Sequence, residues 1–147
     1  MNKAFVREPD QTADYCPRCG SQGDPVVRET LDAQLPPPLR CRFGDAANFC
    51  PAPLCEAVYF DVFERVVTAA ELGRPVCPKD PQAPLCGCFG LTADDVERDL
   101  AEGGVTRVRA LLEKAKSADA QCLRRAANGR SCVPFVQRYY MQRRGTR

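Results

Sequence analysis

The chain has 147 residues, of which 44% are hydrophobic and 27% are charged, and its net charge is +2. These values are typical of one globular domain or two small ones. The chain has no histidine, which excludes zinc sites with imidazole ligands, Rieske clusters and hydrolase sites that need a histidine base. It has ten cysteines, so any metal that it binds is expected to lie on sulfur.

The compartment is inferred from what the sequence lacks. No apolar run is long enough to span a bilayer, and the first 15 residues lack the hydrophobic segment of a signal peptide. We therefore expect a cytoplasmic protein with no membrane partner. Thiols stay reduced in the cytoplasm, so the cysteines are expected to bind metal rather than to form disulfides.

Two cysteine pairs mark the first half of the chain. Cys16 and Cys19 form a Cys-x-x-Cys turn, and Cys50 and Cys55 form a second, slightly wider pair. Two such pairs can complete a tetrahedral sulfur site for zinc. Two alternatives stay open: the second pair consists of buried thiols, or Cys41 replaces Cys55 as the fourth ligand.

The elements expected in the first half are short. Residues 24–35 predict a strand and a helix that begins at Thr30, and the prolines of 36–40 predict a rigid connector. Alternation of apolar residues over 57–67 predicts one strand or a hairpin, followed by a brief helix that begins with a capping box at Thr68. Such a small α+β module has little core of its own, which gives a structural zinc ion a role.

The pattern becomes helical in the second half. Residues 73–84 carry four prolines and are expected to form a linker. A capping box opens a helix over 93–102, and two glycines end it. Apolar spacing predicts a second helix over 107–116, capped by Thr106, and a last helix from about Pro134.

The remaining ligand candidates lie in the loops that flank the first two of these helices. Cys86 and Cys88 precede the first helix, and Cys122 and Cys132 follow the second. A helical hairpin brings both loops to one end, where four thiolates fit a [2Fe-2S] cluster, two for each iron. Gly87 is expected to let neighbouring thiols reach one metal. The same thiols fit zinc, but the hairpin and an adjacent phenylalanine that can exclude water favour iron.

Four stretches, "YCPRCGSQGDPVVRETL", "FCPAPLCEAVYF", "LCGCFGLTADDVERDL" and "CLRRAANGRSC", resemble in that order the N-terminal region of CopZ-type copper chaperones. The second half is also similar to bacterioferritin-associated ferredoxin. The resemblance implies an α+β zinc-binding module over 1–76 and a helical [2Fe-2S] module over 77–147. By position, the iron ligands would be Cys86, Cys88, Cys122 and Cys132, and the zinc ligands Cys16, Cys19, Cys50 and Cys55.

The sequence also departs from that family. A glycine stands at 87, where the family often has an aromatic residue, and "NGRSCV" lacks the family's proline and double cysteine. The Met-x-Cys-x-x-Cys loop that carries copper has no counterpart in these residues. We therefore expect a one-electron carrier, or a reductant of Cu(II) in copper handling, whose partner is a redox protein or a copper-carrying protein. The alternative is an adaptor whose cluster senses metal or redox state and controls partner binding.

Two cysteines and a basic end are left over. Cys41 and Cys77 are either inert thiols or an extra soft-metal site or redox pair. Residues 121–147 hold seven arginines and no acidic residue. These arginines either solvate the last helix and offset a negative cluster, or dock an acidic redox partner, or steer nucleic acid. Nothing else in the sequence predicts nucleic-acid binding.

Overall fold

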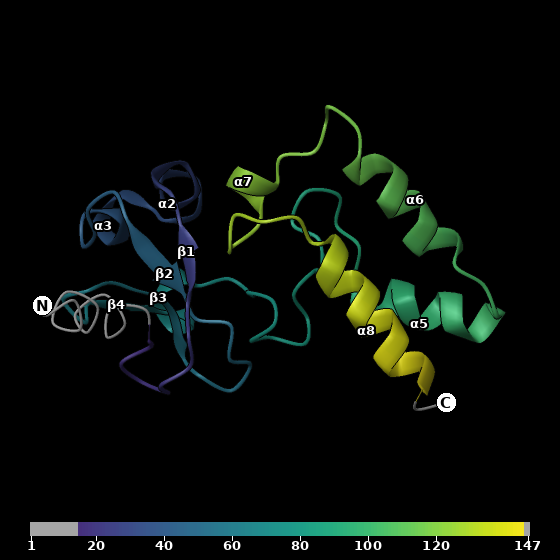
Figure 1. Cartoon of the computed structure of the whole chain (residues 1–147), viewed down its shortest axis with the longest axis horizontal. Helices are drawn as coiled ribbons and strands as arrows, with labels where there is room; N and C mark the ends of the chain where they lie inside the picture. Colours follow the sequence, from purple (N-terminus) through teal and green to yellow (C-terminus); the bar gives the residue numbers. More distant parts are fainter. Residues whose placement is uncertain (1–14, 146–147) are drawn as a thin grey trace, which may run out of the picture.

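The computed structural model describes residues 15–145. Residues 1–14, which hold most of the segment tested for a signal peptide, and residues 146–147 lie outside the described residues. The described chain has a sheet part and a helical part, with the short helix α7 lying between them (Figure 1). This mixture of helices and antiparallel strands confirms the α+β prediction.

The sheet part is built on four short antiparallel strands in the order β1-β2-β3-β4. They are β1 (Asp24–Val26), β2 (Ala47–Phe49), β3 (Ala57–Phe60) and β4 (Val66–Thr68). The apolar stretch over 57–67 is thus a hairpin, which is one of the two structures predicted for it. Cys50 directly follows β2, and Cys55 comes two residues before β3, so the hairpin between these strands carries one cysteine pair.

The helices of the sheet part correct two expectations. Helix α2 (Arg28–Gln34) begins two residues before Thr30, whose buried hydroxyl donates to the carbonyl of Leu123 instead of capping the helix. Helix α3 (Pro37–Arg40) occupies the expected connector, because prolines suit the first turn of a helix. Helix α4 (Ala69–Leu72) begins with the predicted capping box at Thr68.

The sheet part has two apolar clusters. The larger one packs α2, α3 and the sheet together around Leu31, Phe49 and Tyr59, with Val76 of the linker against it. The smaller one surrounds Phe60. It includes the cysteines Cys16, Cys50 and Cys55. The zinc candidates are therefore built into a small core that contains few other apolar side chains.

The helical part consists of three longer helices. Helix α5 (Ala93–Glu102) has the predicted capping box and ends at a left-handed glycine, and α6 (Thr106–Ala115) returns toward its start (Figure 1). Helix α8 (Val133–Gly145) crosses both, and between α6 and α8 lies the single turn of α7 (Cys122–Arg125). No helix of the described residues is long and apolar enough to cross a membrane.

The start of α6 differs from the prediction. Thr106 is its first helical residue and not its cap. The free backbone N–H groups of Arg107 and Val108 donate instead to the carboxylate of Asp99, at 3.1 Å and 2.9 Å. Asp99 lies on α5 and is fully buried. A side chain of one helix thus caps the next, which fixes the hairpin that carries the second cysteine group.

Candidate metal centres

The first centre is a compact group of four thiols in the sheet part. The sulfur atoms of Cys16, Cys19, Cys50 and Cys55 all lie within 4.8 Å of one another. The pairs from the two loops interleave: Cys16 Sγ is 3.9 Å from Cys55 Sγ, and Cys19 Sγ is 3.6 Å from Cys50 Sγ. This donor set fits one zinc ion in tetrahedral coordination. Cys41, the other candidate for the fourth ligand, is exposed and does not belong to this group of four close thiols.

The thiols of this centre differ in how readily they lose a proton. A hydrogen bond from the Ser21 side chain lowers the pKa of Cys19 to about 6. Burial raises the pKa of Cys50 to about 12 and also raises the pKa of Cys55. Cys19 is therefore more readily ionised than Cys50 and Cys55, whose thiols lose their protons on coordination.

Lys79 is a residue of this centre that the sequence did not reveal. Its ammonium group donates to the carbonyls of Ala52 and Cys55, at 2.7 Å and 3.1 Å, so the linker holds the loop that carries two of the thiols. Its positive charge also acts to lower the pKa of Cys50. Because Lys79 lies in a proline-rich stretch far from the cysteine pairs in sequence, no spacing rule marks it.

The second group consists of two thiol pairs, each joining the two expected loops. Cys88 Sγ lies 3.9 Å from Cys122 Sγ, and the thiols of Cys86 and Cys132 are close enough to shift each other's pKa. The helical hairpin thus brings the two loops together. Each thiol of the Cys-x-Cys stretch thus has a later cysteine as its neighbour. From the sequence we expected instead that a bend at Gly87 would bring Cys86 and Cys88 to one metal.

The surroundings of these pairs suit a buried anionic group. Cys86 and Cys132 are buried in the apolar cluster of α5, α6 and α8, with Phe89 packed against it. The backbone N–H of Phe89 donates to Cys86 Sγ at 3.4 Å. A hydrogen bond from the backbone of Gln121 acts to lower the pKa of Cys88. Such N–H donors favour the negative charge of thiolates.

The thiols of the second group differ in how readily they lose a proton. The hydrogen bond between Cys86 and Cys132 lowers the pKa of Cys86 to about 6 and raises the pKa of Cys132. Burial raises the pKa of Cys88. Cys86 is therefore more readily ionised than Cys88 and Cys132 before any metal binds.

Gly87 is required by a close approach of two backbones. A Cβ atom at this position would overlap the carbonyl oxygen of Arg125, at the end of α7. A larger residue here would push away the segment that carries Cys122. The close contact with α7 gives a physical reason for glycine at this position.

The two remaining cysteines join neither group. Cys41 is exposed and donates to the carbonyl of Pro38 at 3.2 Å. Cys77 is partly buried, and burial raises its pKa to about 11. They do not form a disulfide with each other, since both thiols are free.

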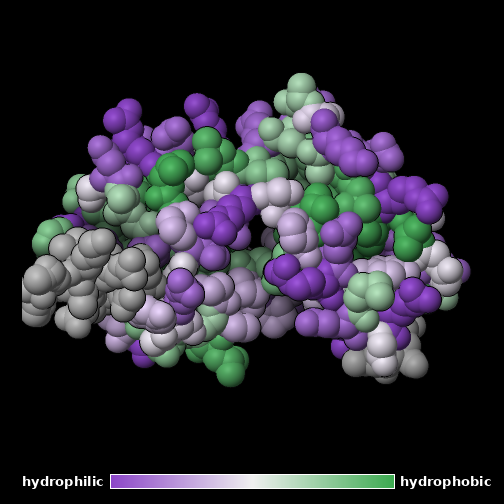
Figure 2. Space-filling view, in the orientation of Figure 1, coloured by the Kyte–Doolittle hydropathy of each residue, from purple (hydrophilic) through white to green (hydrophobic). Residues whose placement is uncertain are grey.

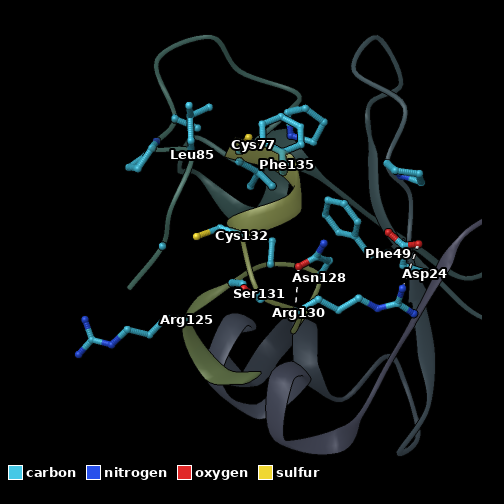
Figure 3. Close-up of a pocket in the computed structure, with 18 of the residues that line it drawn as sticks. Asp24, Phe49, Cys77, Leu85, Arg125, Asn128, Arg130, Ser131, Cys132 and Phe135 are labelled. Atoms are coloured by element: carbon cyan, nitrogen blue, oxygen red, sulfur yellow. Dashed lines mark hydrogen bonds and ion pairs between the residues drawn. The ribbon is translucent and has the colours of Figure 1, made fainter. Parts of the chain in front are cut away.

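A cleft of about 800 Å³ separates the two parts of the chain. Figure 2 shows the surface hollowed between them. Cys77 and Cys132 line the cleft, and Arg130 reaches across it toward Asp24, 3.9 Å away (Figure 3). The arginines of the C-terminal region are thus partly engaged within the fold, as is Arg143, which bonds Glu97 at 2.7 Å.

Comparisons with known proteins agree with this geometry. Residues 13–73 match the CopZ zinc-finger family, described as a zinc binding domain. The fold is similar to an X-ray structure of the N-terminal domain of CopZ from Archaeoglobus fulgidus, with a TM-score of 0.72 and 25% identity over 84% of this chain and 95% of that chain. No curated protein gave a significant match. The sheet part is therefore a zinc-binding domain of this type.

Proposed function

We propose that this CopZ-type N-terminal region carries one zinc ion and one [2Fe-2S] cluster and transfers single electrons in copper handling. The zinc ligands are Cys16, Cys19, Cys50 and Cys55. The cluster ligands are Cys86, Cys88, Cys122 and Cys132. A bound [2Fe-2S] cluster supplies one-electron chemistry. We keep the boundary between a zinc module over 1–76 and a cluster module over 77–147 as part of the proposal.

The observation that carries the cluster assignment is the arrangement of its thiols as two pairs. A single zinc ion is best held by four sulfurs that are all mutually close, as in the first centre. The second group instead offers two thiols at each of two positions, which is the ligand set that two bridged irons require. Burial of Cys86 and Cys132 supports the same reading, because it keeps water away from the metal.

The chain's own residues determine how an electron would enter and leave. Cys88 and Cys122 are partly exposed, whereas Cys86 and Cys132 are buried. We therefore expect an electron to pass between the cluster and its partner at the side of Cys88 and Cys122. That partner would be a redox protein or a copper-carrying protein, with Cu(II) as the substrate to be reduced. Because thiolate ligands must stay reduced, we assign the protein to the cytoplasm.

A second function is favoured by the cleft between the two parts. The segment that leads to Cys132 lines this cleft together with residues of the sheet part. The shape of the cleft would therefore change with cluster occupancy, as expected for an adaptor that senses metal or redox state. Partner affinity that depends on cluster occupancy, without fast electron exchange, would favour this function over electron transfer.

The cluster assignment is tested by metal and sulfide analysis of anaerobically purified protein. We expect red-brown protein with about two irons and two acid-labile sulfides per chain. Cys88→Ala should remove the colour and the iron, whereas Cys41→Ala, an exposed thiol outside both groups, should keep them. Colourless protein with two zinc ions per chain would contradict the proposal.

The zinc assignment is tested separately. Cys19→Ala should abolish binding of one zinc ion and lower the unfolding temperature, because the small apolar cluster around Phe60 depends on the metal. Zinc content and thermal unfolding of the variant measure both effects. A variant that keeps its zinc and its stability would show that the ion binds elsewhere.

A further inference from the structure

Helix α7 and the loop after it are held by side chains of the sheet part. The Thr30 hydroxyl donates to the carbonyl of Leu123 at 2.5 Å, and Gln34 Nε2 donates to the carbonyl of Arg124 at 2.6 Å. The Tyr59 hydroxyl donates to the carbonyl of Ala127. Three donors from one part of the chain thus meet three carbonyls of the other.

These carbonyls belong to a segment that cannot satisfy them by itself. A helix leaves its last carbonyls without an intrahelical partner, and α7 is only one turn long. Among the described residues, the backbone bonds of this region end on the carbonyls of Gln121, Cys122 and Ala126, and not on the three that the sheet part contacts. The three bonds are partly buried, and a carbonyl that loses both its partner and part of its contact with water costs free energy, so these side chains help to determine where the segment lies.

The donors are themselves fixed in place. Thr30 and Tyr59 are fully buried, and Tyr59 packs edge-on against Phe49, at a centroid distance of 5.9 Å. Arg74 donates to the side-chain oxygen of Gln34, which turns the nitrogen of that amide toward α7. Gly129 lies so close to Thr30 that a Cβ atom would overlap the hydroxyl, which places a third point of the segment against α2.

The same side chains are connected to the zinc centre through the sheet. Phe49 directly precedes Cys50, and the amide of Cys50 donates to the carbonyl of Val58 at 2.9 Å, next to Tyr59. On its other side the 122–132 segment meets the Cys-x-Cys stretch, where the carbonyl of Arg125 lies against Gly87. The segment is therefore clamped between the zinc-binding domain and the first two cluster ligands.

We infer that the zinc-binding domain positions the 122–132 segment through Thr30, Gln34 and Tyr59, so that zinc occupancy controls how well the chain retains its cluster. We call the bonds from Thr30, Gln34 and Tyr59 to the 122–132 segment the clamp. The control of the cluster by zinc rests on the proposed function, whereas the clamp does not. The three side chains are positioning residues, since the bonds that they make to the 122–132 segment go to its backbone and not to Cys122 or Cys132. The two parts then depend on each other and are not independent metal modules.

The test compares hydrogen exchange and iron retention in full-length protein. Tyr59→Phe removes a hydroxyl, and Thr30→Val replaces one with a methyl group. Their combination should speed amide exchange in peptides covering 121–132 by about tenfold or more, from the loss of two hydrogen bonds. Iron release to a chelator should accelerate by a similar factor while zinc content stays at one per chain. Thr30→Ser alone, which keeps the hydroxyl that bonds Leu123, should behave like the parent.

Tyr140→Phe is the matched control. It removes a tyrosine hydroxyl that donates to the carbonyl of Gly104 at 3.2 Å, within the helical part. We expect it to leave exchange over 121–132 and iron retention unchanged. Removing zinc from the parent with a chelator should, in contrast, speed exchange over 121–132 as the double variant does.

The outcomes separate this inference from the proposed function. Exchange over 121–132 can be followed in protein without a cluster, so the clamp is tested even if the parent contains no iron, a result that would defeat the cluster assignment alone. Unchanged exchange in the double variant or in the zinc-free parent would overturn the clamp. Faster exchange with unchanged iron retention would overturn the control of the cluster by zinc.

Discussion

At the scale of single residues, Gly87 sets the distance between the two loops that carry the second thiol group. A Cβ atom would overlap the carbonyl of Arg125, so Gly87→Ala should displace the segment with Cys122 and cost about 1–3 kcal/mol as overpacking does. We expect iron content to fall severalfold and the unfolding temperature to drop. Gly44→Ala is the control, because nothing lies within 4 Å of a Cβ atom there. Full iron loading of Gly87→Ala would contradict the close approach.

Lys79 offers a second prediction at this scale. Lys79→Met keeps the length of the side chain but removes the two bonds to the carbonyls of Ala52 and Cys55. Zinc transfer to a chromogenic chelator should become about tenfold faster, since hydrogen bonds from a charged donor are among the stronger ones. Lys116→Met, at the exposed end of α6, should transfer zinc at the parent rate. Equal rates for both variants would mean that the linker does not hold the zinc loop.

At the scale of elements, the cap that Asp99 provides joins α5 to α6. Burial acts to raise the pKa of Asp99, but bonds from the Val108 and Arg107 amides and from the Arg107 guanidinium lower it overall. Because the folded pKa is the lower one, the stabilisation is present above the unfolded value of about 3.9 and is lost as the pH falls through the folded value.

Asp99→Asn tests this cap. At pH 7 the variant should lose about 2 kcal/mol of unfolding free energy, the contribution typical of hydrogen bonds to a charged acceptor. The difference from the parent, measured by urea unfolding in a Cys88→Ala background, should shrink as the pH falls below about 4, through the lowered pKa of Asp99. Asp94→Asn, exposed in the first turn of α5, should show no such pH-dependent gap. A difference that stays constant with pH would show that the charge of Asp99 does not hold the hairpin.

Local sequence rules predicted the elements that depend on local chemistry. The capping boxes at Thr68 and Thr92 occur as predicted, because both partners of each box lie within one turn. The helix starts expected at Thr30 and Thr106 were wrong for a common reason. At the first, the hydroxyl bonds α7, and at the second, a carboxylate of another helix provides the cap. Contacts between elements that are distant in sequence decide both starts, and no local pattern encodes them.

At the scale of the whole molecule, cysteine spacing predicted which thiols lie close together, but not which other residues hold these groups in place. The sequence predicted the four thiols of the first centre and the two loops that carry the second group, but not the pairing of Cys88 with Cys122. Lys79 and the donors on α2 and β3 were not predicted, because their partners are backbone carbonyls, which carry no sequence signature. The bonds from the sheet part to α7 were not predicted for the same reason, and the division into modules over 1–76 and 77–147 stays a prediction.

The proposed function makes its own prediction for the intact molecule, in which reduced protein meets Cu(II). A [2Fe-2S] cluster cycles by one electron, so anaerobic, prereduced protein should produce about one Cu(I) per cluster, read with a Cu(I)-specific chelator. Free thiols also reduce copper, and Cys41 and Cys77 are both free. The double variant Cys41→Ala/Cys77→Ala must therefore be measured beside the parent. Cu(I) that persists in this variant but disappears in Cys88→Ala would place the electron on the cluster. A reduced cluster that Cu(II) fails to reoxidise would instead direct the search to another electron acceptor or to a sensing role.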